Sequence, residues 1–113
     1  MRAVNAWLGP ARTVTPLHTD PHHNLLCQVL GAKLVLLFAP DQAARLYPFE
    51  AGLTTNSSQV DARAPDAARF PTYAAAKGLR CRLDAGQALY IPPGWWHYVE
   101  SLSPSASVSF WWR

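Results

Sequence analysis

The sequence is poor in charged residues and has no long apolar run. Charged residues make up 15% of the 113 positions, whereas half are hydrophobic. Disordered chains combine few apolar residues with many charges, so this composition excludes disorder. A membrane helix needs roughly 18 consecutive apolar residues, and the sequence has no such run. Ten prolines, six glycines and the absence of heptads exclude a coiled coil.

Cysteines, basic clusters and targeting signals are also scarce. The only cysteines, Cys27 and Cys81, lie in separate apolar runs without a CxxC pattern, so we expect two reduced, packed thiols. The net charge of +3 comes from scattered residues, and we therefore expect no direct nucleic-acid binding. Residues 1–10 contain no apolar segment typical of a secretory signal, and no membrane association is expected. We expect a cytoplasmic or nuclear protein.

Short apolar runs separated by turn residues predict an all-β domain. Asn24–Leu30 and Lys33–Ala39, joined at Gly31, have the pattern of a hairpin. Further strands are expected at Leu79–Leu83, Ala88–Ile91, Trp96–Leu102 and Ser105–Trp112. Several short strands at this spacing favour an antiparallel sandwich or barrel formed by a single domain.

A polar, irregular segment interrupts the strands at about residues 41–78. It includes the sequence TTNSSQVDARAPDAARFP and is expected to form only one or two helical turns. A loop this long within a compact domain is usually functional or a domain-specific insert.

Three residues have the spacing of a metal site. His18 and Asp20 are two positions apart, so in an extended chain their side chains lie on the same side. His97 follows a Pro92-Pro93-Gly94 turn that would direct it toward the mouth of a barrel. Two histidines and one carboxylate form the facial triad that suits non-haem Fe(II). We expect their donor atoms to converge within about 4 Å, close enough for one ion.

Longer motifs resemble a known family. The segments NAWLGPARTVTPLHTDPHHNLLCQVLGAKLVLLFAP and GQALYIPPGWWHYVESL, with SVSFWW near the end, resemble JmjC-domain 2-oxoglutarate and Fe(II) oxygenases of the cupin-like superfamily. The resemblance covers nearly the whole chain. It implies a double-stranded β-helix, or jelly roll, and assigns residues 1–113 to the C-terminal portion of the JmjC domain. The polar segment matches an insert of the family, which implies an ordered functional segment.

The resemblance also implies the roles of individual residues. His18, Asp20 and His97 match the iron ligands and catalytic centre, and Lys33 matches the residue that pairs with the distal carboxylate of 2-oxoglutarate. Other matches are Thr15, Asn24 and Trp111 on the cosubstrate side, and Trp7 on the substrate side. Judged by its neighbours alone, Lys33 is unusual, because an unpaired ammonium within an apolar strand is costly unless an anion compensates it. His22 and His23 do not match the triad and are expected at the rim.

The implied activity is an Fe(II)-, 2-oxoglutarate- and O2-dependent oxygenase that hydroxylates a protein side chain. The reaction would be arginine hydroxylation or lysine demethylation, with a protein or peptide as substrate. A complete fold of this family has earlier strands, and their absence here would leave an exposed sheet edge. Alternatives are an inactive or truncated metal-binding module, a cupin-type Zn or Mn protein that does not use 2-oxoglutarate, and a small-molecule oxygenase.

Overall fold

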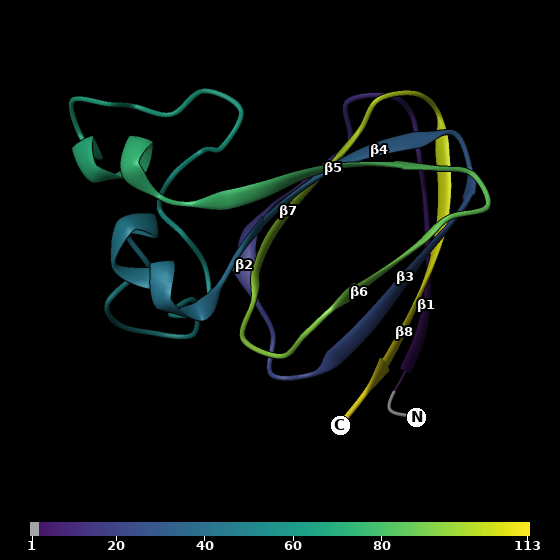
Figure 1. Ribbon diagram of the computed structural model, residues 1–113, viewed down its shortest axis with the longest axis horizontal. Coiled ribbons are helices and arrows are strands. Elements are labelled where there is room, and N and C mark those ends of the chain that lie inside the picture. The colour runs from purple at the N-terminus through teal and green to yellow at the C-terminus, as the bar shows by residue number, and fades with distance from the viewer. Residues whose placement is uncertain (1–2) are drawn as a thin grey trace.

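Two four-stranded antiparallel sheets face each other in the structure, a computed structural model that describes residues 3–113 (Figure 1). Sheet A has the order β1-β8-β3-β6, and sheet B has the order β2-β7-β4-β5. The strands are β1 (Ala3–Gly9), β2 (Val14–Thr19), β3 (His23–Leu30), β4 (Ala32–Phe38), β5 (Gly78–Asp84), β6 (Ala88–Ile91), β7 (Trp96–Ser101) and β8 (Ser105–Trp112). This arrangement confirms the predicted all-β jelly roll.

The chain changes sheets between most consecutive strands, and the hairpin predicted around Gly31 is therefore wrong. Strand β3 pairs with β6 and β8, whereas β4 pairs with β5 and β7. Gly31 has a φ of +73°, and a side chain there would collide with the carbonyl of Pro104. The backbone amide of Ala32 also donates to the Ser103 hydroxyl at 3.0 Å. The connection from β3 to β4 therefore packs tightly against the connection from β7 to β8. At Gly31 the chain crosses from sheet A to sheet B and does not fold back as a hairpin.

The apolar core has two parts, one on each side of sheet B. The part between the sheets consists of Leu26, Val35, Leu37, Leu83 and Ile91. The other covers the outer face of sheet B and consists of Leu17, Phe38, Leu46, Trp96 and Tyr98. Strand β4, in the middle of sheet B, therefore contributes to apolar clusters on both faces, which explains its nearly continuous apolar sequence.

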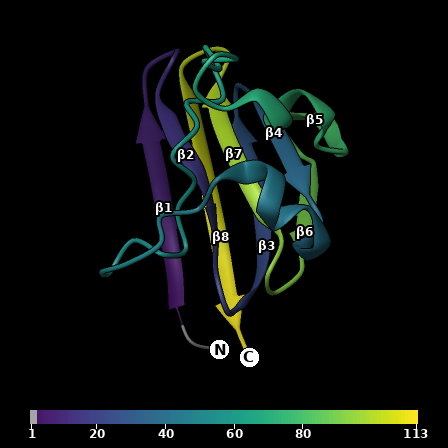
Figure 2. The same ribbon diagram turned by 90° about the vertical axis from the view of Figure 1, so that its left-hand side faces the viewer.

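The polar segment, which connects β4 to β5 in the sequence, packs against the outer face of sheet B. It contains two 3-10 helices, η1 (Pro40–Leu46) and η2 (Pro71–Ala75), and lies in front of sheet B in Figure 2. Leu46, the last residue of η1, is completely buried where the segment meets sheet B. Its backbone also bonds to β2: the Thr19 amide donates to the Asn56 carbonyl, and the Ser58 amide donates to the Leu17 carbonyl. The segment is thus bonded to the strand that carries His18.

The fold also bears on the cysteines and on membrane-spanning helices. Cys27 and Cys81 are free, as expected, but they are half-buried and not fully packed in the core. No helix among residues 3–113 has the length and apolar character needed to cross a membrane.

Candidate metal centre and pocket

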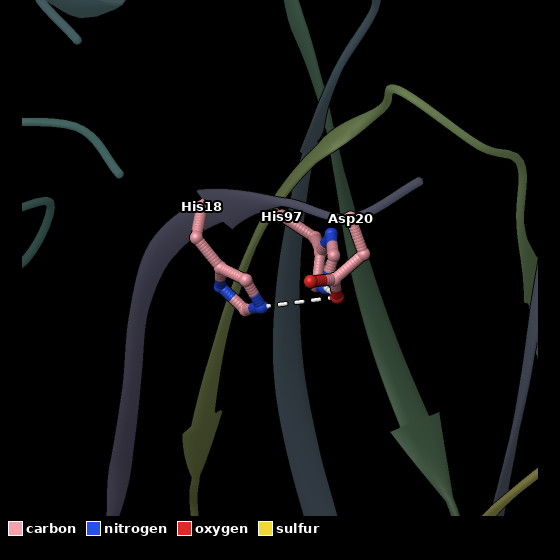
Figure 3. A group of neighbouring side chains, drawn as sticks. All are labelled: His18, Asp20 and His97. Atoms are coloured by element: carbon pink, nitrogen blue, oxygen red, sulfur yellow. Dashed lines mark ion pairs between the residues drawn. The ribbon is translucent and has the colours of Figure 1, made fainter. Parts of the chain in front are cut away.

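Strands β2 and β7 bring three candidate ligands together. His18 lies directly opposite His97 in the β2–β7 register, just after a bulge in β2. Asp20 follows the end of β2, and its carbonyl accepts a hydrogen bond from the Gly94 amide in the turn before β7. One donor atom from each of the three side chains lies within 4.8 Å of the others. Figure 3 shows the three side chains pointing toward one another.

The distances within this cluster suit a single ion. Asp20 Oδ2 is 3.3 Å from His18 Nε2 and 3.6 Å from His97 Nε2. These separations are close to those between neighbouring ligands of a metal with bonds of about 2.0–2.2 Å. His18, Asp20 and His97 therefore converge as expected, although the three donor atoms together span up to 4.8 Å and not the predicted 4 Å or so.

Backbone carbonyls orient both imidazole rings. His18 Nδ1 lies 2.8 Å from the Pro16 carbonyl oxygen, and His97 Nδ1 lies 3.1 Å from that of Trp95. A carbonyl only accepts, so each Nδ1 carries the hydrogen and donates it. The Nε2 atoms, which face Asp20, are thereby the nitrogens available to a metal. This arrangement is the outer-shell support typical of histidine ligands.

Electrostatics within the cluster favour the metal-binding form of Asp20 and His97, and a proton shared between His18 and Asp20. Hydrogen bonding with His18 lowers the pKa of Asp20 despite its burial, so the carboxyl is ionised at neutral pH. Burial, and then the nearby His18, lower the pKa of His97 to about 4, which leaves this ring neutral. Burial lowers the pKa of His18, but hydrogen bonds with Asp20 and Pro16 outweigh this effect and raise it overall. A cation at Nε2 would replace the proton that His18 shares with Asp20.

Lys33 occupies another part of the same pocket. Its side chain lines the pocket together with the His18 cluster, and the residue is 7% exposed. Among residues 3–113, no carboxylate forms an ion pair with Lys33. Burial lowers the pKa of its ammonium group. An anionic ligand in the pocket would compensate this charge.

The remaining predicted residues also line this pocket. Thr15, Asn24, Trp111 and Trp7 all contribute to its wall. Asn24 Oδ1 and Trp111 Nε1 are buried without a hydrogen-bond partner within residues 3–113. The Trp7 indole instead donates to the Ser109 hydroxyl at 2.9 Å, and 42% of Trp7 is exposed. The donor set at the metal end, the unpaired ammonium and the two unpaired polar atoms together fit Fe(II) and 2-oxoglutarate.

Sequence reasoning missed several polar residues of the pocket. Ser101 lies opposite Lys33 in the β4–β7 register, and Ser109 holds Trp7. Both are buried and line the pocket. The sequence feature that could have revealed them is the serine at every second position of β8. Ser105, Ser107 and Ser109 form an inward-facing polar row.

The two other histidines lie outside the cluster, as expected, and both are half-buried instead of solvated. His22 stacks on Trp111 with ring centroids 5.9 Å apart, and its Nδ1 is buried. His23 stacks on Trp112 at 5.2 Å and bonds to the Tyr90 hydroxyl.

Comparison with known proteins agrees with this geometry. A family model described as a cupin-like domain matches residues 1–113. The chain belongs to the cupin-like JmjC domains. It is 51% identical over 112 residues to lysine-specific demethylase JMJ30 of Arabidopsis thaliana, a match covering 99% of this chain and 26% of the relative. It is 50% identical over 110 residues to Jumonji C domain-containing protein 5 of Drosophila melanogaster, covering 97% of this chain and 27% of the relative.

A human JmjC relative has a name that includes a hydroxylase activity. The chain is 37% identical over 130 aligned residues to the bifunctional peptidase and (3S)-lysyl hydroxylase JMJD7, a match covering 96% of this chain and 41% of that protein. This JmjC domain thus spans about a quarter of the length of the first two relatives and less than half of the human one.

Proposed function

We propose that this JmjC domain binds Fe(II) and 2-oxoglutarate and hydroxylates a protein side chain. The observation that carries the proposal is the pairing of two features in one pocket. The cluster of His18, Asp20 and His97 offers two imidazole nitrogens and a carboxylate, and a buried ammonium without a carboxylate partner among residues 3–113 accompanies it. A divalent cation and a dicarboxylate would complete both features.

In this proposal, His18, Asp20 and His97 hold the iron, and Lys33 pairs with the far carboxylate of 2-oxoglutarate. The Thr15 hydroxyl donates a further hydrogen bond to that carboxylate. Asn24 and Trp111, whose buried polar atoms have no hydrogen-bond partner among residues 3–113, contact the cosubstrate from β3 and β8. Iron and 2-oxoglutarate supply the oxidising chemistry with O2, while the protein positions them and limits access of water.

The substrate is proposed to be an arginine or lysine side chain of a protein or peptide. Two relatives are named as a lysine-specific demethylase and a lysyl hydroxylase. The motifs of the chain also resemble the arginyl hydroxylase type of the family. Trp7 offers a partly exposed aromatic wall on the side where a substrate would enter. The two free cysteines agree with a reducing cytoplasmic or nuclear location.

The test uses the intact 113-residue chain. Metal binding would be measured by titration with Fe(II) under anaerobic conditions, and turnover by succinate formation from 2-oxoglutarate in air. Stoichiometric metal binding with 2-oxoglutarate-dependent succinate formation would support the proposal. Metal binding without any cosubstrate binding would favour a cupin-type metal-binding module, and failure to bind metal would refute both functions.

A further inference from the structure

The polar segment holds the residue that lies between two of the three candidate metal ligands. Thr19 separates His18 from Asp20 in the sequence, and both of its backbone groups bond to Asn56. The Thr19 amide donates to the Asn56 carbonyl at 2.9 Å, and the side-chain amide of Asn56 donates to the Thr19 carbonyl at 3.0 Å. One asparagine therefore closes a pair of hydrogen bonds around the backbone of a single residue.

Neighbouring contacts extend this pairing along β2. Ser57 forms an isolated antiparallel bridge with His18, and the Ser58 amide donates to the Leu17 carbonyl at 3.0 Å. On its other side, β2 pairs with β7 through the same histidine. The ligand-bearing end of β2 is thus held between β7 and residues 56–58.

Strand β2 is irregular just before this point. The β2–β7 register shifts between Thr15 and His18. Pro16 and Pro21, which flank the ligand segment, have no amide hydrogen to donate. A bulge and two prolines interrupt the regular ladder that would otherwise fix the course of the strand. The orientation of the ligand segment therefore depends on its remaining backbone bonds, two of which involve Asn56.

The bonds to Thr19 are anchored in the interior of the polar segment. The Ser58 hydroxyl donates to the Leu46 carbonyl at 2.5 Å and accepts from the Val60 amide at 3.0 Å. Leu46 and Val60 are both buried. Asn56 itself is exposed, so its side chain adds little to the apolar burial that stabilises the fold. Its carboxamide can therefore be removed without opening the core.

We propose that Asn56 is a positioning residue for the metal centre. Its carboxamide holds the Thr19 peptide in the orientation that keeps His18 and Asp20 on the same side of the chain before an ion binds. Contacts behind the ligands that fix their orientation raise the affinity for a metal. The inference rests on the metal-binding part of the proposed function and does not depend on 2-oxoglutarate.

The first experiment is Asn56→Ala in the intact chain. It removes the side-chain hydrogen bond and leaves the backbone bonds of residues 56–58 in place. Loss of one neutral hydrogen bond predicts about three- to tenfold weaker binding of Co(II), which serves as an air-stable probe of the site. Calorimetric titration of the metal-free protein would measure the affinity. The visible absorption of bound Co(II), which reports the arrangement of its ligands, should also differ from that of the wild type.

Gln59→Ala is the matched control. The Gln59 side-chain amide also donates to a backbone carbonyl, that of Pro48 at 3.4 Å, but this bond stays within the polar segment. Circular dichroism and thermal melting without metal would show how much each substitution destabilises the fold. Only Asn56→Ala should weaken Co(II) binding, whatever the two values of Tm.

Amide hydrogen exchange of the metal-free protein provides a second measurement. In Asn56→Ala, the Thr19 amide should exchange about three- to tenfold faster than in the wild type, because its local opening becomes easier. In Gln59→Ala its exchange should stay the same. Unchanged exchange at Thr19 in Asn56→Ala would show that the carboxamide does not hold this peptide and would overturn the inference.

The metal titration separates failure of the inference from failure of the proposed function. A wild-type chain that binds no Co(II) overturns both. Tight wild-type binding with less than a threefold loss in Asn56→Ala, measured well below the Tm, overturns the inference alone and leaves the metal site standing. An equal loss in Gln59→Ala also overturns it, because the effect would then come from general loosening of the polar segment.

Discussion

The metal end and the Lys33 end of the pocket differ in how their charges are balanced. At the metal end, the Asp20 carboxylate lies within 3.6 Å of both imidazoles, so the three side chains compensate one another even without an ion. Lys33 has no carboxylate partner in the described chain and is buried. The first group is thus a complete site for a cation, whereas the second becomes balanced only when an anion binds.

This difference separates two functions that share the same metal ligands. A cupin-type metal-binding module needs only the cluster of His18, Asp20 and His97. An oxygenase that uses 2-oxoglutarate also needs the cation that pairs with the cosubstrate. Variants at the two ends should therefore affect different measurements.

The largest effect is expected from His18→Ala. It removes one of only three protein ligands, so metal binding and succinate formation should both be lost, even at saturating 2-oxoglutarate. Calorimetric metal titration and a succinate assay would measure these losses. His23→Ala is the matched control, because His23 lies on the outer face of sheet A and away from the cluster. Full metal affinity in His18→Ala would contradict the proposed site.

Lys33→Ala should affect the cosubstrate alone. Loss of a charge-assisted contact costs about 1.5–3 kcal/mol, so the half-saturating concentration of 2-oxoglutarate should rise roughly tenfold to hundredfold. Metal affinity should stay the same, because all three ligands remain. Lys77→Ala, a change at an exposed lysine, serves as the control. An unchanged half-saturation point would favour the metal-binding module.

Thr15→Val should have a smaller effect at the same end. A neutral hydrogen bond contributes about 0.5–1.5 kcal/mol, which predicts a two- to tenfold rise in half-saturating 2-oxoglutarate. Thr13→Val removes a hydroxyl that already donates to the Pro10 carbonyl, and it should alter cosubstrate binding little. Equal effects of the two substitutions would argue against a direct role of Thr15.

The smallest effect concerns stability without cosubstrate. Burial lowers the pKa of Lys33, so its charged form is less favourable in the folded state than in the unfolded chain. This penalty is fully present below the folded pKa and disappears as the pH rises through the unfolded value. Lys33→Met should therefore raise the Tm at neutral pH by about 2–5 °C, and the gain should shrink at alkaline pH. Thermal melts at several pH values would test this, and a lower Tm at neutral pH would contradict it.

The sequence predicted those features that depend on local spacing. His18 and Asp20 needed only an extended backbone, and the turn before His97 was marked by its prolines and glycine. The bounds of Ala88–Ile91 and Ser105–Trp112 were also predicted correctly. These features rest on short-range geometry, which the residue pattern records directly.

Features that depend on pairing between distant strands could not be predicted in the same way. The crossover at Gly31 looked like a hairpin, because the sequence does not record that Pro104 packs against it. Strand β1 was missed because its exposed and half-buried residues give no apolar alternation toward the core. The serines of β8 point inward, opposite to the usual rule, so the pocket wall they form was not recognised.

The contacts of the polar segment with β2 have a consequence for intermolecular strand pairing. The bonds from Thr19 to Asn56 and from Ser58 to Leu17 occupy backbone groups along part of the outer edge of sheet B. The outer edge of β1, which flanks the other side of the pocket, pairs with no other strand within residues 3–113. Exposed strand edges are templates for aggregation. Of the two edges beside the pocket, β1 is therefore where another extended chain can add by backbone hydrogen bonding, and a proline or lysine introduced there would protect the protein during concentration.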